Sequence, residues 1–348
     1  MKIGILTLHF SKNYGAVLQT YALLSIIKVK GHTPFVIDRV PEYKSFLHKM
    51  YHRYSLKEHL SWRKLDQFVK EQLFPKTKRY ASFKSLDVFE KEKFDAIIVG
   101  SDQVWRFKVV GLNYFLDFVR DSKIRKIAYA ASFGKSNWDE TDYVEDTDKI
   151  RGLLQQFNSI SVREDSGVNI CKNIFNVDAE CVLDPTLLFT GEFYRKTLLS
   201  KYIRSDSGKI ISYFLGSKKY DNINYCSSLA NQYGLVYEDL YTRSSFLHVS
   251  VEYWLNEICN AKYVITNSFH GMVFAILFRK FFLIINLDGG GSSRIMSLVA
   301  KLGLQKRYVD SITDVTISKL DEYIDYDMVH ERLSELRQES LRFLNSSI

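Results

Sequence analysis

The stretch Tyr263–Leu277, which reads YVITNSFHGMVFAIL, decides the fold prediction. Its first four residues, Tyr263–Thr266, are β-branched or aromatic and predict a buried strand. Its second half is apolar without a break, and the turn between the halves contains Asn267, Ser268 and His270. This order predicts a strand, a turn and a helix within an α/β sheet.

Ligands bind at such turns because the carboxyl end of the strand and the amino end of the helix face the same space. The N–H groups at a helix start favour an anion. His270 has a side chain that can gain or lose a proton near neutral pH. The alternative is that Asn267 and Ser268 only cap the helix and that His270 packs at an interface. The residues alone leave both interpretations open.

Length and composition predict a globular protein of two domains. The chain has 348 residues, of which 46% are hydrophobic and 4 are Pro, so each domain can bury a core of its own. The 22 Tyr and 24 Phe predict aromatic-rich cores, with a sugar-binding surface as the alternative. No stretch is as long and apolar as a membrane span, which needs about 18 apolar residues or more.

The cysteines and the first residues favour a cytoplasmic location. The four cysteines show no CxxC spacing and no neighbouring His cluster, so we expect thiols in a reducing compartment and no metal site. The first residues, MKIGILTLHF, are too short an apolar run for a signal peptide.

Much of the net charge of +8 lies in one segment. Lys44–Arg79 contains ten Lys or Arg and only three acids, with aromatic residues among them. A solvated helical excursion from the first domain is one interpretation. The other is a surface that contacts an anionic acceptor or lipid at the inner face of the membrane. Nucleic acid is not indicated, because no binding motif accompanies the charge.

The first 40 residues predict one βαβ unit. Lys2–Leu8 and Thr33–Ile37 read as strands and Ala16–Val29 as the helix between them. Asn13 and Gly15, in the turn before the helix, are the candidate substrate-binding residues of this unit. No GxGxxG motif is present, so a dinucleotide is not indicated.

Polar residues also follow two later strands. Ser101 and Asp102 come after the apolar strand Phe94–Val99, which predicts either a ligand site or a helix cap. Ser159–Val162 is a further strand, with Arg163 at its end.

The linker Ser205–Gly208 predicts a boundary between two domains. We expect a first domain over 1–200 with a helical insertion at about 44–90, a second over 201–320, and a C-terminal helix over 321–348 that packs back on the first. Gly290, in a Gly-rich loop, and Arg294, directly after it, are further candidates for substrate binding.

Five motifs in this order together resemble the polysaccharide pyruvyl transferase family, from Lys2 to about Arg307: NYGAVLQTYAL, GSDQVW, SVRE, DPT and TNSFHGMVFAI. The resemblance implies an α/β fold with two Rossmann-like parallel-sheet domains, which face a central cleft as in the GT-B glycosyltransferases. It also implies a reaction. A pyruvyl group passes from phosphoenolpyruvate to a lipid-linked or nucleotide-linked sugar of a capsule or exopolysaccharide precursor, and a ketal forms. Phosphoenolpyruvate is a co-substrate, and no other cofactor is implied.

The resemblance assigns residues to this reaction. His270 matches the histidine expected to act as general acid and base, and Arg163 matches a donor-binding arginine. An ion pair of Arg163 with Glu164 or Asp165 is the structural alternative. Ketal-forming members often read Arg-Leu-His where this chain has Ser-Phe-His, so either Arg294 provides the cation beside Ser268 and Asn267, or the donor differs. A GT-B glycosyltransferase using a nucleotide-sugar and a non-catalytic glycan-binding protein are the competing functions.

Overall fold

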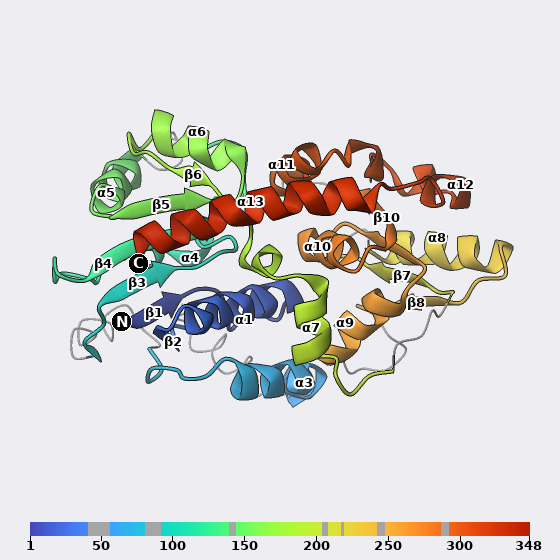
Figure 1. Ribbon diagram of the computed structural model, residues 1–348, viewed down its shortest axis with the longest axis horizontal. Coiled ribbons are helices and arrows are strands. Elements are labelled where there is room, and N and C mark those ends of the chain that lie inside the picture. Colours follow the sequence, from blue (N-terminus) through green and yellow to red (C-terminus); the bar gives the residue numbers. More distant parts are fainter. Residues whose placement is uncertain are drawn as a thin grey trace. The chain divides into compact units, whose positions relative to one another are not determined.

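The computed structural model describes residues 1–40, 56–80, 92–138, 144–203, 208–216, 219–241, 248–286 and 292–348 (Figure 1). The chain forms two compact units. Unit 1 comprises the described parts of 1–54, 69–188 and 334–348, and unit 2 those of 55–68 and 189–333.

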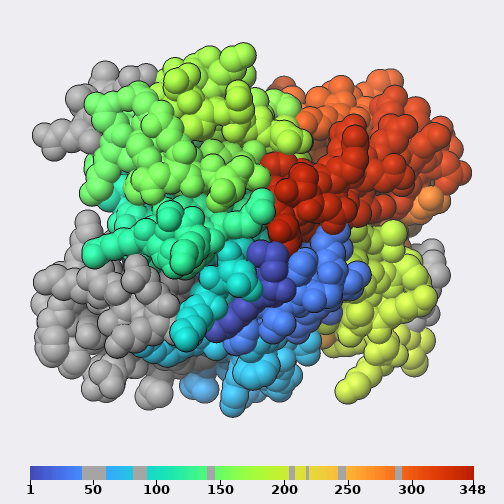
Figure 2. Space-filling view, turned by 60° about the vertical axis from the view of Figure 1, so that its left-hand side comes forward, coloured from blue at the N-terminus to red at the C-terminus, as the bar shows by residue number. Residues whose placement is uncertain are grey.

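Unit 1 contains a six-stranded parallel sheet in the order β2-β1-β3-β4-β5-β6. The strands are β1 Lys2–Leu6, β2 Thr33–Val36, β3 Ala96–Val99, β4 Arg125–Ala131, β5 Ser159–Val162 and β6 Glu180–Cys181. The helices are α1 Tyr14–Val29, α4 Phe107–Val110, α5 Val144–Leu154 and α6 Asp165–Asn173. A parallel sheet is covered on both faces, which is why β3 is wholly apolar and wholly buried. In Figure 2 the teal and green segments of this unit lie side by side on one face.

Unit 2 contains a five-stranded parallel sheet in the order β11-β10-β9-β7-β8. The strands are β7 Ile210–Tyr213, β8 Tyr237–Asp239, β9 Tyr263–Thr266, β10 Phe281–Ile285 and β11 Tyr308–Val309. The helices are α7 Gly191–Thr197, α8 Lys219–Gln232, α9 Val251–Asn260, α10 Phe269–Leu277, α11 Ser292–Leu302 and α12 Ile317–Leu320. The α/β fold class predicted from the sequence is therefore confirmed.

Each sheet has one point at which the strand order reverses. In unit 1 it lies between β1 and β3, and in unit 2 between β7 and β9. Ligands of open α/β sheets bind beside the carboxyl ends of the strands at such reversal points. We call the side of each sheet on which the carboxyl ends of its strands lie the unit 1 edge and the unit 2 edge.

The division of the chain differs from the predicted boundary at residue 200, because it falls between Leu188 and Phe189. Helix α7 belongs to unit 2, where the rings of Tyr194 and Phe274 are 5.0 Å apart. In the same helix Arg195 donates from Nε to the Cys259 sulfur at 3.3 Å.

The predicted basic insertion is divided as well. Helix α3, Leu56–Gln72, begins in unit 2, where Trp62 stacks on the His248 ring with 3.6 Å between centroids. The backbone N–H of His248 also donates to the Ser61 carbonyl at 2.8 Å. The excursion was expected to belong to the first domain, whereas residues 56–68 of this helix belong to unit 2 and residues 69–72 to unit 1. Of the predicted insertion at about 44–90, residues 44–55 and 81–90 lie outside the described residues.

The C-terminal helix α13, Tyr326–Ser347, begins in unit 2 and ends in unit 1. Within unit 1 the Leu183 N–H donates to Ser340 Oγ at 2.9 Å, and Arg337 Nε donates to the Leu187 carbonyl at 2.9 Å. Among the residues that the structure describes, no helix combines the length and the apolar composition that crossing a membrane requires.

Candidate functional site

At the unit 2 edge, two side chains tie the ends of β7 and β9 together. Thr266 donates from Oγ1 to the Tyr213 carbonyl at 2.6 Å. Asn267 accepts from the Leu215 N–H and donates to the Leu215 carbonyl, both at 2.8 Å. The predicted donor-binding residue Asn267 thus continues the pairing of the two strands beyond their ends. Both the oxygen and the nitrogen of its side-chain amide take part.

Ser268 begins helix α10 as its N-cap residue. Its backbone is extended, and its Oγ accepts from the Gly271 N–H at 3.4 Å. A Cβ atom at Gly271 would lie 2.5 Å from Thr266 Oγ1, so only glycine lets the first turn of α10 approach β9 this closely. The cap and the glycine together fix the backbone on both sides of His270.

His270 is the second residue of α10, and 6% of its surface is exposed. Its ring meets that of Phe269 edge to face, 5.2 Å between centroids. Arg294, the third residue of α11, is 8% exposed. Because α10 and α11 follow the neighbouring parallel strands β9 and β10, both residues belong to the carboxyl side of the unit 2 sheet. Gly290 lies outside the described residues.

At the unit 1 edge, the structure brings three predicted residues together around a carboxylate. Arg163 donates from Nη1 to Asp184 Oδ2 at 2.7 Å, with Asp102 Oδ1 3.6 Å from its Nη2. Ser101 donates from Oγ to the same Asp184 oxygen at 2.8 Å. The side chains of Arg163 and Asp184 are 1% and 0% exposed. Burial alone lowers the pKa of Arg163, but Asp184, Asp102 and Glu164 raise it overall.

Asp184 is the buried partner of Ser101 and Arg163 that the sequence analysis missed. Its other oxygen, Oδ1, accepts from the N–H and Oγ1 of Thr186 at 3.0 and 2.6 Å. The predicted alternative for Arg163 was an ion pair with Glu164 or Asp165. The structure gives ion pairs with Asp184 and Asp102, and the charge of Glu164 also raises the pKa of Arg163. The signal was available, since Asp184 follows a strand as Ser101 and Arg163 do, and parallel strands end on one side of a sheet.

Asn13 is the N-cap of α1, where its Oδ1 accepts from the N–H groups of Gly15 and Ala16 at 2.8 and 3.3 Å. A second missed feature follows the neighbouring strand ends: the buried His9 has its Nε2 3.0 Å from Asp38 Oδ1. Burial raises the pKa of the Asp38 carboxyl, but its hydrogen bond with His9 and the charges of His9, Arg79 and Lys76 hold that pKa below its usual value overall.

The described residues contain no group of three or more His, Cys, Asp or Glu side chains arranged to hold a metal ion. Both edges offer hydrogen-bonding and charged side chains on the side of the sheet where α/β folds bind ligands.

Comparison with known proteins gives a family and a fold. The family model described as polysaccharide pyruvyl transferase matches residues 13–289. No curated protein matches the chain. Similar solved structures include the UDP-GlcNAc 2-epimerase of Neisseria meningitidis bound to UDP-GlcNAc, with a TM-score of 0.55 and 12% identity over 99% of this chain and 100% of that one.

A putative UDP-N-acetylglucosamine 2-epimerase of Listeria monocytogenes gives a TM-score of 0.56 at 10% identity, over 97% of this chain and 90% of that one. The Rickettsia bellii UDP-N-acetylglucosamine 2-epimerase gives 0.55 at 11%, over 99% and 96%. At this identity the likeness shows the fold alone, which is of the GT-B type.

Proposed function

The chain belongs to the polysaccharide pyruvyl transferase family, and we propose that it transfers the pyruvyl group of phosphoenolpyruvate to a lipid-linked or nucleotide-linked sugar. The family match confirms the resemblance read from the five motifs and makes the chain a transferase of polysaccharide synthesis. The observation that supports the proposal best is the place of His270, on a fixed backbone in the first turn of α10 at the unit 2 edge.

The proposed reaction needs one proton donor and one proton acceptor. A proton adds to the methylene carbon of phosphoenolpyruvate, and a sugar hydroxyl forms a C–O bond to the neighbouring carbon. The C–O bond to phosphate breaks, and a second hydroxyl of the same sugar takes its place. Of the two hydroxyl protons, one balances the new methyl group and the other leaves with phosphate. A single histidine that gives and then takes a proton can serve both steps.

We assign the proton transfers to His270 and the donor's negative charge to the start of α10 and to Arg294. The N–H groups of a helix start and a guanidinium are the groups that proteins use to hold phosphate and carboxylate. Ser268 adds a hydroxyl where ketal-forming relatives often have arginine. The ion pair of Arg163 with Asp184 favours a structural role for that arginine, so it is not part of the proposed donor site.

The test is release of phosphate from phosphoenolpyruvate by the full chain, measured across a panel of acceptor sugars free, phosphorylated and lipid-linked. We expect release that depends on one acceptor, and a pyruvylated product of matching mass. A ligand that binds the folded state raises the melting temperature, so phosphoenolpyruvate should protect the protein against heat.

The competing functions give different results in the same assays. A glycosyltransferase of this fold would be protected by uridine or guanosine diphosphate and not by phosphoenolpyruvate. A glycan-binding protein would release no phosphate with any acceptor, and His270 would be dispensable. Either result would overturn the proposed function.

A further inference from the structure

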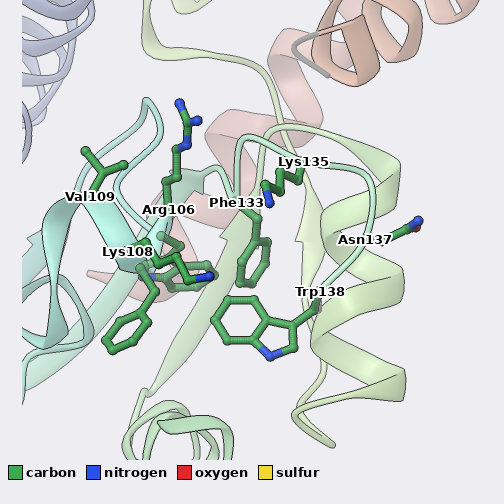
Figure 3. A pocket seen from close by; sticks show the side chains of 9 residues that line it. Arg106, Lys108, Val109, Phe133, Lys135, Asn137 and Trp138 are labelled. Carbon is green, nitrogen blue, oxygen red and sulfur yellow. The ribbon is translucent and has the colours of Figure 1, made fainter. Parts of the chain in front are cut away.

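A pocket of about 110 Å³ lies on unit 1 where the chain leaves β3 and β4 (Figure 3). Its walls come from two segments, 105–109 and 133–138. We call it the Trp105–Trp138 pocket. Both segments follow the carboxyl ends of adjacent strands, on the side of the sheet where α/β domains bind ligands. Nothing in the proposed donor site uses it.

The floor of the Trp105–Trp138 pocket is aromatic. Trp105 and Phe133 are 0% and 3% exposed, with 5.1 Å between ring centroids, and Phe133 meets Trp138 at 5.9 Å. Each indole N–H is used inside the unit: Trp105 donates to the Tyr114 carbonyl at 3.0 Å and Trp138 to Thr147 Oγ1 at 2.9 Å. The partly exposed Trp138 and the edge of Phe133 therefore offer carbon surface to a ligand and no hydrogen-bond donor, and the buried Trp105 packs behind Phe133.

The rim of the pocket is cationic. Arg106, Lys108 and Lys135 line it together with the aromatic rings, and no lining residue, all of them within the described chain, is acidic. Figure 3 shows Lys108 extending across the pocket and Asn137 pointing away from it. Three like charges around a low-dielectric floor raise the local concentration of anions.

The wall that contains Phe133 and Lys135 is held in place before any ligand binds. Ser132 accepts from the Gly134 N–H at 3.1 Å and donates to Glu164 Oε1 at 2.7 Å. Gly134 has a φ of +71°, and a Cβ there would lie 2.9 Å from Gln103 Oε1, so the turn requires glycine. A preformed wall costs less ordering entropy on binding.

An apolar floor beneath a cationic rim fits a ring that has both an apolar face and a phosphate. We propose that the Trp105–Trp138 pocket binds the phosphorylated end of a sugar acceptor, with the phosphate beside Lys108 and Lys135 and the sugar face on Phe133 and Trp138. A volume of about 110 Å³ is several times the roughly 10–15 Å³ that a single water needs, so part of a sugar ring can enter. That this sugar is the acceptor rests on the proposed function; that the pocket binds it does not.

Titration calorimetry on the full chain tests the pocket directly. The probes are the 1-phosphates of glucose, galactose, mannose and N-acetylglucosamine, with the four free sugars, inorganic phosphate and phosphoenolpyruvate as comparisons. We expect one 1-phosphate to bind, its free sugar at least tenfold more weakly. The double variant Lys108→Ala, Lys135→Ala should weaken binding about 10–100-fold or more, the worth of a charge-assisted contact. Lys123→Ala, an exposed lysine of unit 1, should bind as wild type.

The two sources of a sugar phosphate are separated by two larger probes. A uridine diphosphate sugar and a citronellyl diphosphate sugar, each with the preferred hexose, share the sugar diphosphate and differ in the uridine or lipid group attached to it. Whichever binds more tightly identifies the source, and both should lose affinity in the double variant. Failure of all four 1-phosphates and both larger probes to bind would overturn the proposal.

Other outcomes separate this proposal from the proposed function. Sugar 1-phosphate binding that the double variant weakens, without phosphate release from phosphoenolpyruvate, would leave the pocket standing and overturn the donor assignment. Turnover with an unchanged acceptor KM in the double variant would overturn the assignment of this sugar as the acceptor. Phosphoenolpyruvate displacing the sugar phosphate at equal affinity would overturn the pocket, because the pocket would then select phosphate alone.

Discussion

The edges of the two sheets have similar sequences, in which polar residues follow apolar strands. The contacts that these polar residues make are different. At the unit 1 edge, Ser101 and Arg163 follow apolar strands and bind one buried carboxylate, that of Asp184. At the unit 2 edge, the polar residues after β9 cap a helix, and His270 occupies its first turn. The difference is a counter-charge from a neighbouring strand. Polar residues after a buried strand therefore predict the carboxyl edge of a sheet. Whether they bind each other or can contact a ligand depends on whether a neighbouring strand provides a counter-charge.

The largest expected effect is a loss of turnover when the unit 2 edge is changed. His270→Ala should lower turnover roughly 10²–10⁴-fold, the usual worth of one acid–base group, while the affinity for phosphoenolpyruvate changes little. Single-turnover kinetics and a thermal melt of the same sample measure the two effects. His330→Ala is the matched control, because this histidine binds the Ile276 carbonyl at 3.1 Å in the same unit. Full turnover in His270→Ala would remove the catalytic assignment.

The next effect is on the stability of the unit 1 edge. Arg163→Ala leaves the Asp184 carboxylate buried without its cation, and breaking such a pair typically costs about 3–5 kcal/mol of unfolding free energy. Urea unfolding measures this cost. Arg342→Ala removes an exposed arginine paired with Glu339 and should cost less than about 1 kcal/mol. If Arg163→Ala kept its stability and bound phosphoenolpyruvate more weakly, the sequence-based donor assignment would replace the structural one.

A smaller effect tests how closely α10 must approach β9. Gly271→Ala places a Cβ 2.5 Å from Thr266 Oγ1 and 3.1 Å from Thr266 Cβ, an overpacking that typically costs about 1–3 kcal/mol. Gly152 lies within α5 with nothing within 4 Å of an added Cβ. Gly152→Ala should therefore stabilise the protein by about 0.4–1 kcal/mol. Equal changes in melting temperature for the two variants would refute this account of the turn.

The smallest effect is a pH dependence at the unit 1 edge. The folded pKa of Asp38 lies below its usual 3.8, so Asp38 adds stability that is complete above pH 3.8 and is lost as pH falls through the folded pKa. Unfolding in urea between pH 6 and 2 should show a shallower acid-side loss for Asp38→Asn than for wild type. Asp148→Asn, at a carboxylate with an 80% exposed side chain, should follow the wild-type slope. Parallel curves for all three proteins would contradict the pairing of Asp38 with His9.

Two strands were predictable to the residue, whereas the apolar run Phe94–Val99 was two residues longer than β3, Ala96–Val99. The expected bounds Tyr263–Thr266 and Ser159–Val162 are those of β9 and β5, because polar residues stop each run abruptly. The family was predicted from resemblance alone, through five motifs that stand in the same order in this chain.

The partners of the site residues were less predictable, because they come from distant parts of the chain. Arg163 pairs with Asp184 across β5 and β6, and His9 with Asp38 across β1 and β2. The domain boundary was misplaced for the same reason. Ser205–Gly208 has the composition of a linker, but the packing of Tyr194 on Phe274 puts α7 in unit 2.

The order of the segments along the chain has a consequence for biosynthesis. Unit 1 needs the last residues of α13: Ser340 accepts the Leu183 N–H, and the Phe343 ring lies 6.3 Å from that of Tyr129. A ribosome therefore releases all of unit 2 before it supplies the segment that completes unit 1. Until the last turns of α13 are synthesised, nascent unit 1 exposes the apolar surface that Phe343 and Leu344 later cover, which is the stage at which chaperones would bind it.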